Sequence, residues 1–148
     1  MVVIVGGGAK KVSSSLAHKK VESSLLFEGR AERTRQRLEK VLEGLSSGNW
    51  SNLYQVVWAE FWDMHALFET SEPSFSYFLP GTFEVLEKTR SFWEEKGDGP
   101  VVTMDAGPNV HLLWRSDQKS MALEFYYQNL KSHWTTLSNI EDIGFARV

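Results

Sequence analysis

The residue types best suited to chemistry lie together in the segment Thr103-Met104-Asp105-Ala106-Gly107-Pro108-Asn109. Apolar runs flank this segment, Val101-Val102 before it and Val110 to Trp114 after it, so the pattern predicts a turn between two buried strands. Asp and Asn bond their own backbone in turns, Gly accepts a positive φ and Pro fixes φ. The residues alone therefore indicate a plain turn, with the Asp105 carboxylate held at its corner.

A second group of polar side chains is the hydroxyl cluster Ser13-Ser14-Ser15, which comes directly before the helical pattern from Leu16 to Leu26. A serine oxygen at a helix start accepts a hydrogen bond from a backbone N–H that has no partner within the helix. The same N–H groups also make a helix start suitable for an anion. Helix capping explains these serines, and anion binding stays open beside it.

Several other classes of chemistry lack support in the sequence. The segment Gly6-Gly7-Gly8-Ala9-Lys10-Lys11 departs from the G-x-x-x-x-G-K-[ST] spacing of a phosphate loop and is read as a connection. There is no cysteine, and the four histidines do not have metal-ligand spacing, so we predict no metal site. The net charge of −3 argues against a nucleic-acid partner.

The apolar run Val2 to Val5 is too short for a signal peptide, and no apolar window reaches the roughly 20 residues that span a bilayer. We therefore predict a cytoplasmic protein without a membrane partner, which binds a small molecule or a protein. Its 148 residues predict a single domain, residues 1–148.

The strands that must position the two polar groups are short. β-branched and apolar runs predict strands at Val2 to Val5, Val101 to Met104 and Val110 to Trp114, and the tail from Gly144 to Val148 is a candidate edge strand.

Helical spacing accounts for most of the remaining chain. A helix from Ala31 to Leu45 has Leu38, Val41, Leu42 and Leu45 on its apolar face, and a second helix follows from about Ser51.

A third helix opens at Pro80-Gly81-Thr82, with Thr82 as the expected N-cap. Its expected buried stripe consists of Phe83, Leu86, Phe92 and Trp93. A last helix extends from Ser116 and Asp117 to about Leu130.

The segment Val102-Thr103-Met104-Asp105-Ala106-Gly107-Pro108-Asn109-Val110 resembles the C-terminal signature of the diphosphomevalonate decarboxylases, in the GHMP kinase superfamily. In that family the aspartate of Asp-Ala-Gly-Pro-Asn is catalytic, so the resemblance assigns this role to Asp105. Two further segments resemble the family in the same order, Met64-His65-Ala66 and Thr70-Ser71-Glu72-Pro73. We interpret His65 as structural or pocket-lining rather than catalytic.

The segment Lys10-Lys11-Val12-Ser13-Ser14 is similar to the family's Lys-x-Val-Ser-Ser-Arg pattern, which contacts the phosphates and carboxylate of the substrate. The resemblance thus implies that Ser13 and Ser14 bind substrate. This chain has Ser15 where the family pattern has arginine, and a serine cannot make the bidentate charge-assisted contact of an arginine.

The resemblance implies an α+β fold like the superfamily's ferredoxin-like C-terminal domain, an antiparallel sheet of about four strands with helices packed on one face. It implies an ATP-dependent decarboxylase of the mevalonate pathway that forms isopentenyl diphosphate in isoprenoid biosynthesis. ATP and Mg²⁺ are expected to be held mainly by an N-terminal ATP-binding domain, which has no counterpart in this chain. The chain starts directly on a strand, so we expect a domain that is inactive alone.

Two other hypotheses remain open at this stage. Ser15 is compatible with a related enzyme that acts on a different acid, such as a phosphomevalonate decarboxylase or a mevalonate 3-kinase. The exposed aromatic surface is compatible with a non-catalytic module that dimerises, and a homodimer is a candidate partner state for the decarboxylase as well.

Overall fold

The computed structural model describes residues 1–8 and 12–136, and these form two compact units. The first unit contains Met1–Gly7 and the chain from Phe78 onward, and the second is Gly8–Tyr77. The prediction of a single domain therefore stays a prediction, and the candidate strand from Gly144 to Val148 lies outside the described residues.

The first unit is built on a four-stranded antiparallel sheet with the order β2-β3-β1-β4. Its strands are β1 (Val2–Ile4), β2 (Val101–Thr103), β3 (Val110–Leu113) and β4 (Thr135–Thr136). The three runs predicted as strands all pair in this sheet, within one or two residues of their expected ends. Strand β4 was not predicted, because two threonines do not form a recognisable apolar run.

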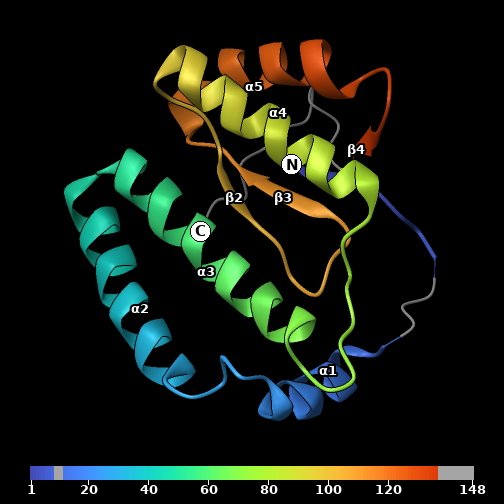
Figure 1. Ribbon diagram of the computed structural model, residues 1–148. Helices are drawn as coiled ribbons and strands as arrows, with labels where there is room; N and C mark the ends of the chain where they lie inside the picture. Colours follow the sequence, from blue (N-terminus) through green and yellow to red (C-terminus); the bar gives the residue numbers. More distant parts are fainter. Residues whose placement is uncertain (9–11, 137–148) are drawn as a thin grey trace. The chain divides into compact units, whose positions relative to one another are not determined.

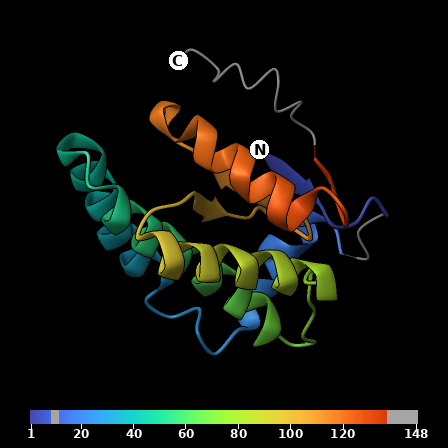
Figure 2. The same ribbon diagram turned by 90° about the horizontal axis from the view of Figure 1, so that it is seen from above.

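The register of the sheet places four fully buried side chains on one face. Val3 lies opposite Val110, and Val102 lies opposite Leu112. All four have no exposed surface, whereas Leu113, which points to the other face, is 49% exposed. Helices α4 (Pro80–Lys96) and α5 (Lys119–Phe125) lie side by side over one face of the sheet (Figures 1 and 2). The predicted α+β fold with helices on one face is confirmed.

Aromatic rings fill the space between the two helices. The Phe92 ring of α4 meets the Phe125 ring of α5 at 5.1 Å and the Trp114 ring at 6.2 Å. Burial of each such ring contributes about 1.5–3 kcal/mol. Two short segments flank α5, the 3₁₀ turn η2 (Ser116–Gln118) and the π-helical turn η3 (Tyr126–Leu130), and together the three match the predicted last helix.

The start of α4 differs from the prediction in two respects. The N-cap residue is Leu79, and Thr82 lies three positions later, where its hydroxyl accepts a hydrogen bond from the Leu79 N–H at 3.2 Å. Phe83 is 50% exposed and packs on Phe78 at the surface, so it does not belong to the buried stripe.

The second unit contains α1, η1 and a long antiparallel helix hairpin. The helices are α1 (Ser14–Lys20), α2 (Arg30–Ser47) and α3 (Trp50–Glu69), and η1 (Val21–Ser23) is a 3₁₀ turn after α1. Gly48 ends α2 with a φ of +68°, and the Asn49 side chain caps α3 by accepting from the Asn52 N–H. Figure 1 shows α2 and α3 running side by side in opposite directions.

The face that α2 turns toward α3 is the charged one, contrary to the expectation from its leucines. Arg30 and Arg37 donate to both Glu60 and Asp63, and Arg33 donates to Asp63. The residues of the expected apolar face are instead largely exposed: Leu38 is 56%, Leu42 57% and Leu45 62% exposed. An ion cluster between complementary charge stripes therefore joins the two helices.

Candidate functional site

The Asp105 side chain lies on the turn between β2 and β3, as the sequence predicted. Asp105 is exposed, and its Oδ1 atom accepts a hydrogen bond of 2.9 Å from the Gly107 N–H. Gly107 has a φ of +77°, a conformation that side chains with a Cβ adopt only with strain. The turn thus presents a carboxylate to the outside while fixing one of its oxygens from within.

Pro108 and Asn109, which follow Gly107 in this turn, are hydrogen-bonded to two other segments of the first unit. The Asn109 Oδ1 atom accepts from the backbone N–H groups of Val5 and Gly6, at 3.0 and 3.3 Å. The Thr82 hydroxyl, which is fully buried, donates to the Pro108 carbonyl at 2.9 Å. The end of β1 and the start of α4 therefore both hold the segment that carries Asp105.

Sequence reasoning identified neither of these two contacts. It took Asn109 as one more turn residue and Thr82 as a helix cap, because both types are common in those roles. The Pro-x-Thr start of the helix and the Asn at the end of the motif were the only signals. Their contacts with backbone groups far away in the sequence can be identified only from the three-dimensional structure.

Ser13 and Ser14 lie at the start of α1, in the second unit. Ser13 is the N-cap residue, and its Oγ atom accepts from the Leu16 N–H at 3.2 Å. Ser14 is the first helical residue, and both serines are exposed. Just before them, the Val12 carbonyl accepts a 2.8 Å hydrogen bond from the Tyr77 hydroxyl.

The structure does not bring the two predicted groups together. Asp105 belongs to the first unit and the serines belong to the second, and each is placed only within its own unit. Lys10 and Lys11 of the same motif lie outside the described residues. That these groups form one site stays a prediction.

His65 lies in the interior of the second unit. It is 1% exposed, and its ring meets the Phe61 and Phe68 rings edge-on at 6.4 and 5.2 Å. These contacts are typical of a packed histidine, and an interior position suits a structural role better than direct work on a substrate.

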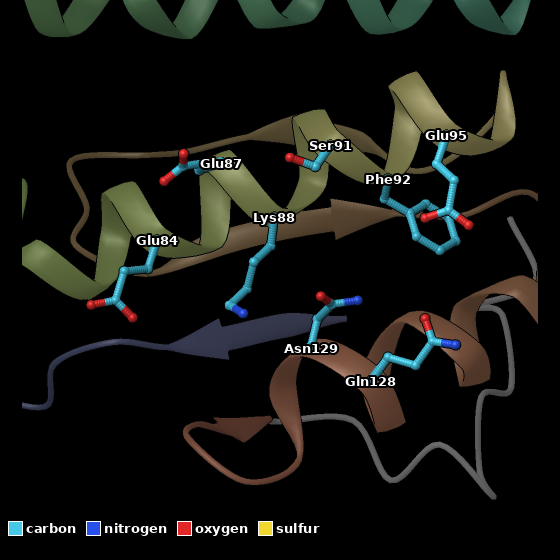
Figure 3. Close-up of a pocket in the computed structure, with 8 residues that line it drawn as sticks. All are labelled: Glu84, Glu87, Lys88, Ser91, Phe92, Glu95, Gln128 and Asn129. Atoms are coloured by element: carbon cyan, nitrogen blue, oxygen red, sulfur yellow. The ribbon is translucent and has the colours of Figure 1, made fainter.

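An open groove of about 450 Å³ lies on the first unit between the outer face of α4 and η3 (Figure 3). It is lined by Glu84, Glu87, Lys88, Ser91, Phe92, Glu95, Gln128 and Asn129. Three glutamates against one lysine give this groove a negative field that repels a diphosphate. It also contains no residue of the predicted site, so we do not assign the phosphorylated substrate to it.

Residues 1–8 and 12–136 show neither a cluster of metal-ligand side chains nor a membrane-spanning helix. This part of the chain contains no group of three His, Cys, Asp or Glu side chains arranged to hold a metal ion. None of the helices in this part of the chain is both long enough and apolar enough to cross a membrane.

Comparison with known proteins gave matches over almost the whole chain. Residues 1–144 match the sequence profile of the mevalonate 5-diphosphate decarboxylase C-terminal domain. No match was found among curated protein sequences.

Three solved structures show the extent of the likeness. A mevalonate diphosphate decarboxylase from Legionella pneumophila is 45% identical, with a TM-score of 0.87 over 90% of this chain and 42% of that one. A mevalonate pyrophosphate decarboxylase from Streptococcus pyogenes is 28% identical, with a TM-score of 0.73 over 86% of this chain and 41% of that one. A structure described as MDDEF in complex with MVAPP, AMPPCP and magnesium is 26% identical, with a TM-score of 0.79 over 90% and 41%. The chain spans less than half the length of each.

Proposed function

Because this chain belongs to the mevalonate 5-diphosphate decarboxylase C-terminal domain family, we propose that it supplies the C-terminal half of an ATP-dependent decarboxylase acting on diphosphomevalonate. The observation that carries the proposal is the Asp-Ala-Gly-Pro-Asn turn, which holds an exposed carboxylate on a braced backbone. The matched structures are named for the diphosphate decarboxylase. The monophosphate enzyme, the 3-kinase and the non-catalytic module are not favoured by these matches.

In this proposal Asp105 is the catalytic residue. Its carboxylate orients the tertiary hydroxyl of the substrate and accepts the proton as the hydroxyl oxygen bonds to the γ-phosphorus of ATP and the bond from that phosphorus to the leaving ADP breaks. Loss of phosphate and carbon dioxide from the phosphorylated acid then gives isopentenyl diphosphate. A negative carboxylate beside the carbon that loses phosphate also stabilises the positive charge developing there. Its exposure on the surface of the first unit suits contact with a substrate held by another part of the protein.

Ser13 and Ser14 are proposed to bind the anionic groups of the same substrate. Both side chains are exposed at the start of α1, where the backbone N–H groups of the first turn favour a nearby anion. Ser15, the next residue, is also exposed and carries no charge, so we expect the bidentate contact of an arginine to come from elsewhere or to be absent.

ATP and Mg²⁺ are proposed as co-substrate and metal, since a 26% identical structure is described with AMPPCP and magnesium. The described residues contain no group of three or more His, Cys, Asp or Glu side chains that could hold a metal ion, and we propose no magnesium ligand among them. We assign both to the N-terminal half of the enzyme, and we expect no turnover by the 148-residue chain. A homodimer and a cytoplasmic location complete the proposal, with no nucleic-acid or membrane partner.

The test is calorimetric titration of the 148-residue chain with diphosphomevalonate and, separately, with MgATP. We expect diphosphomevalonate to bind, and Asp105→Asn and Ser14→Ala each to weaken this binding. Glu94→Gln, which neutralises another exposed carboxylate of the first unit, is the matched control. Equal binding by all variants would contradict the assigned residues, and release of carbon dioxide by the chain alone would contradict its dependence on a second half.

A further inference from the structure

The turn that carries Asp105 is held by the side chains of Thr82 and Asn109. Thr82 comes from the start of α4, 26 residues before Pro108, and Asn109 binds the end of β1, more than 100 residues away in sequence. These contacts join three separate segments of the first unit next to the predicted catalytic carboxylate.

The Thr82 hydroxyl links the first two of these segments. It accepts from the Leu79 N–H at 3.2 Å and donates to the Pro108 carbonyl at 2.9 Å. Thr89, which lies farther along α4, is equally buried, yet its hydroxyl donates to the Val85 carbonyl of its own helix. The two threonines share burial and helix, and they differ in whether the hydroxyl bonds the motif turn.

Asn109 links the turn to the residues directly after β1, and it does so with a single acceptor atom. Its Oδ1 receives the N–H groups of both Val5 and Gly6. A Cβ atom built on Gly6 would lie 2.9 Å from a Leu79 carbon and 3.2 Å from a Pro108 carbon, so the backbone of Gly6 packs directly on Leu79 and Pro108.

We propose that Thr82 and Asn109 are positioning residues for the Asp105 carboxylate, an inference that rests on the catalytic role proposed for Asp105. They fix Pro108 and Asn109, which follow Gly107 directly. Gly107 in turn donates its N–H to Asp105 Oδ1. A shift of Pro108 and Asn109 therefore moves the N–H group that orients the carboxylate.

The test uses the 148-residue chain and nuclear magnetic resonance, which reports on single sites without turnover. Thr82→Val removes the hydroxyl at nearly constant volume, Thr82→Ser restores it, and Thr89→Val is the matched control. In Thr82→Val we expect the Gly107 amide and Asp105 carboxyl signals to shift, and exchange of the Gly107 amide proton to accelerate about three- to tenfold. Thr82→Ser is expected to restore the signals, and Thr89→Val to leave them at their original positions.

The hydrogen bonds of Thr82 with Pro108 and of Asn109 with Val5 and Gly6 together form what we call the brace. A second pair of variants separates the effect of the brace from that of the cap of α4. Asn109→Ala removes the acceptor while leaving Thr82 and Leu79 unchanged, and Asn109→Asp keeps an acceptor oxygen. The proposal requires Asn109→Ala to shift the same two signals and Asn109→Asp to shift them less. This pair also decides the matter if Thr82→Val does not fold.

Unchanged Asp105 and Gly107 signals in both loss variants, or equal shifts in Thr89→Val, would overturn the inference. Titration with diphosphomevalonate on the same samples keeps it distinct from the proposed function. Shifted signals in a chain whose substrate binding is unaffected by Asp105→Asn would retain the brace and reject the catalytic assignment.

Discussion

Replacement of Asp63 by asparagine is expected to destabilise the helix hairpin of the second unit strongly. Asp63 Oδ2 accepts hydrogen bonds from Arg30, Arg33 and Arg37, and the Asp63 side chain is only 12% exposed. The variant leaves three guanidinium groups with Glu60 as the remaining carboxylate of the cluster. Removing one partner from a fully buried ion pair costs about 3–5 kcal/mol. The arginine side chains are 16–34% exposed, so we expect about 2–4 kcal/mol.

The same carboxylate predicts a loss of stability in acid. Burial opposes its charged form, but hydrogen bonds from Arg33 and Arg37 and the charges of Arg37 and Arg30 outweigh burial and lower the pKa of Asp63 from 3.8 to about 2. A carboxyl with a lowered pKa stabilises the folded state above its unfolded value. This stabilisation disappears as the pH falls through the folded value. Between pH 4 and 2 the loss approaches about 2 kcal/mol, and Asp63→Asn should lack this part of the pH dependence.

The assay is urea unfolding followed by circular dichroism at pH 7 and at pH 2.5, with hydrogen exchange of the α2 and α3 amides to report on the second unit alone. Glu39→Gln is the control, because Glu39 pairs with Arg35 on the exposed surface of α2. Such surface pairs contribute about 0–1 kcal/mol. A loss below about 1 kcal/mol for Asp63→Asn, or an equal loss for Glu39→Gln, would refute the view that the cluster joins the helices.

Two glycines give further predictions, both measured by urea unfolding. Gly107→Ala should cost about 1–2 kcal/mol, because a Cβ is unfavourable at a φ of +77°. Gly44→Ala should destabilise by about 1–2 kcal/mol even though alanine is the better helix former, since its Cβ would lie 2.9 Å from Leu53 Cγ and overpacking outweighs helix propensity. Leu53→Ala should remove most of that extra cost in the double variant, and a stabilised Gly44→Ala would contradict the close approach of α2 to α3.

The sequence predicted three strands of the sheet because the signal for each of them lies within a few consecutive residues. The three runs at Val2, Val101 and Val110 are β-branched, short and bounded by turn residues, and each forms a strand where expected. The two-residue strand β4 depends on pairing with β1 and has no comparable local signal. Helix positions were likewise predictable from apolar spacing to within a few residues, except that the first helix ends at Lys20, although its pattern extended to Leu26.

The packed face of α2 was not predictable from apolar spacing. The leucine stripe is the stronger apolar signal, yet the arginine stripe faces α3, because Glu60 and Asp63 offer complementary charges three residues apart. Periodicity shows which side chains share a face, but it does not show which face finds a partner. A search for complementary charge stripes on neighbouring helices would have indicated the cluster.

For the candidate site, the sequence supplied the residues and the structure supplied their support. Asp105, Ser13 and Ser14 came from motif resemblance, and the turn geometry of Asp105 agrees with local rules for Asp and Gly. The brace through Thr82 and Asn109 connects positions far apart in the chain, which no local pattern encodes.

The first residues of the chain have two structural roles that depend on each other. β1 pairs with both β3 and β4, so it is an interior strand of the sheet. Directly after it, the Val5 and Gly6 N–H groups bind Asn109 on the Asp105 turn. Loss of β1 would therefore open the sheet and release one side of the brace at the same time. The geometry around Asp105 thus depends on the residues after β1 and on the start of α4 as well as on the β2-β3 hairpin.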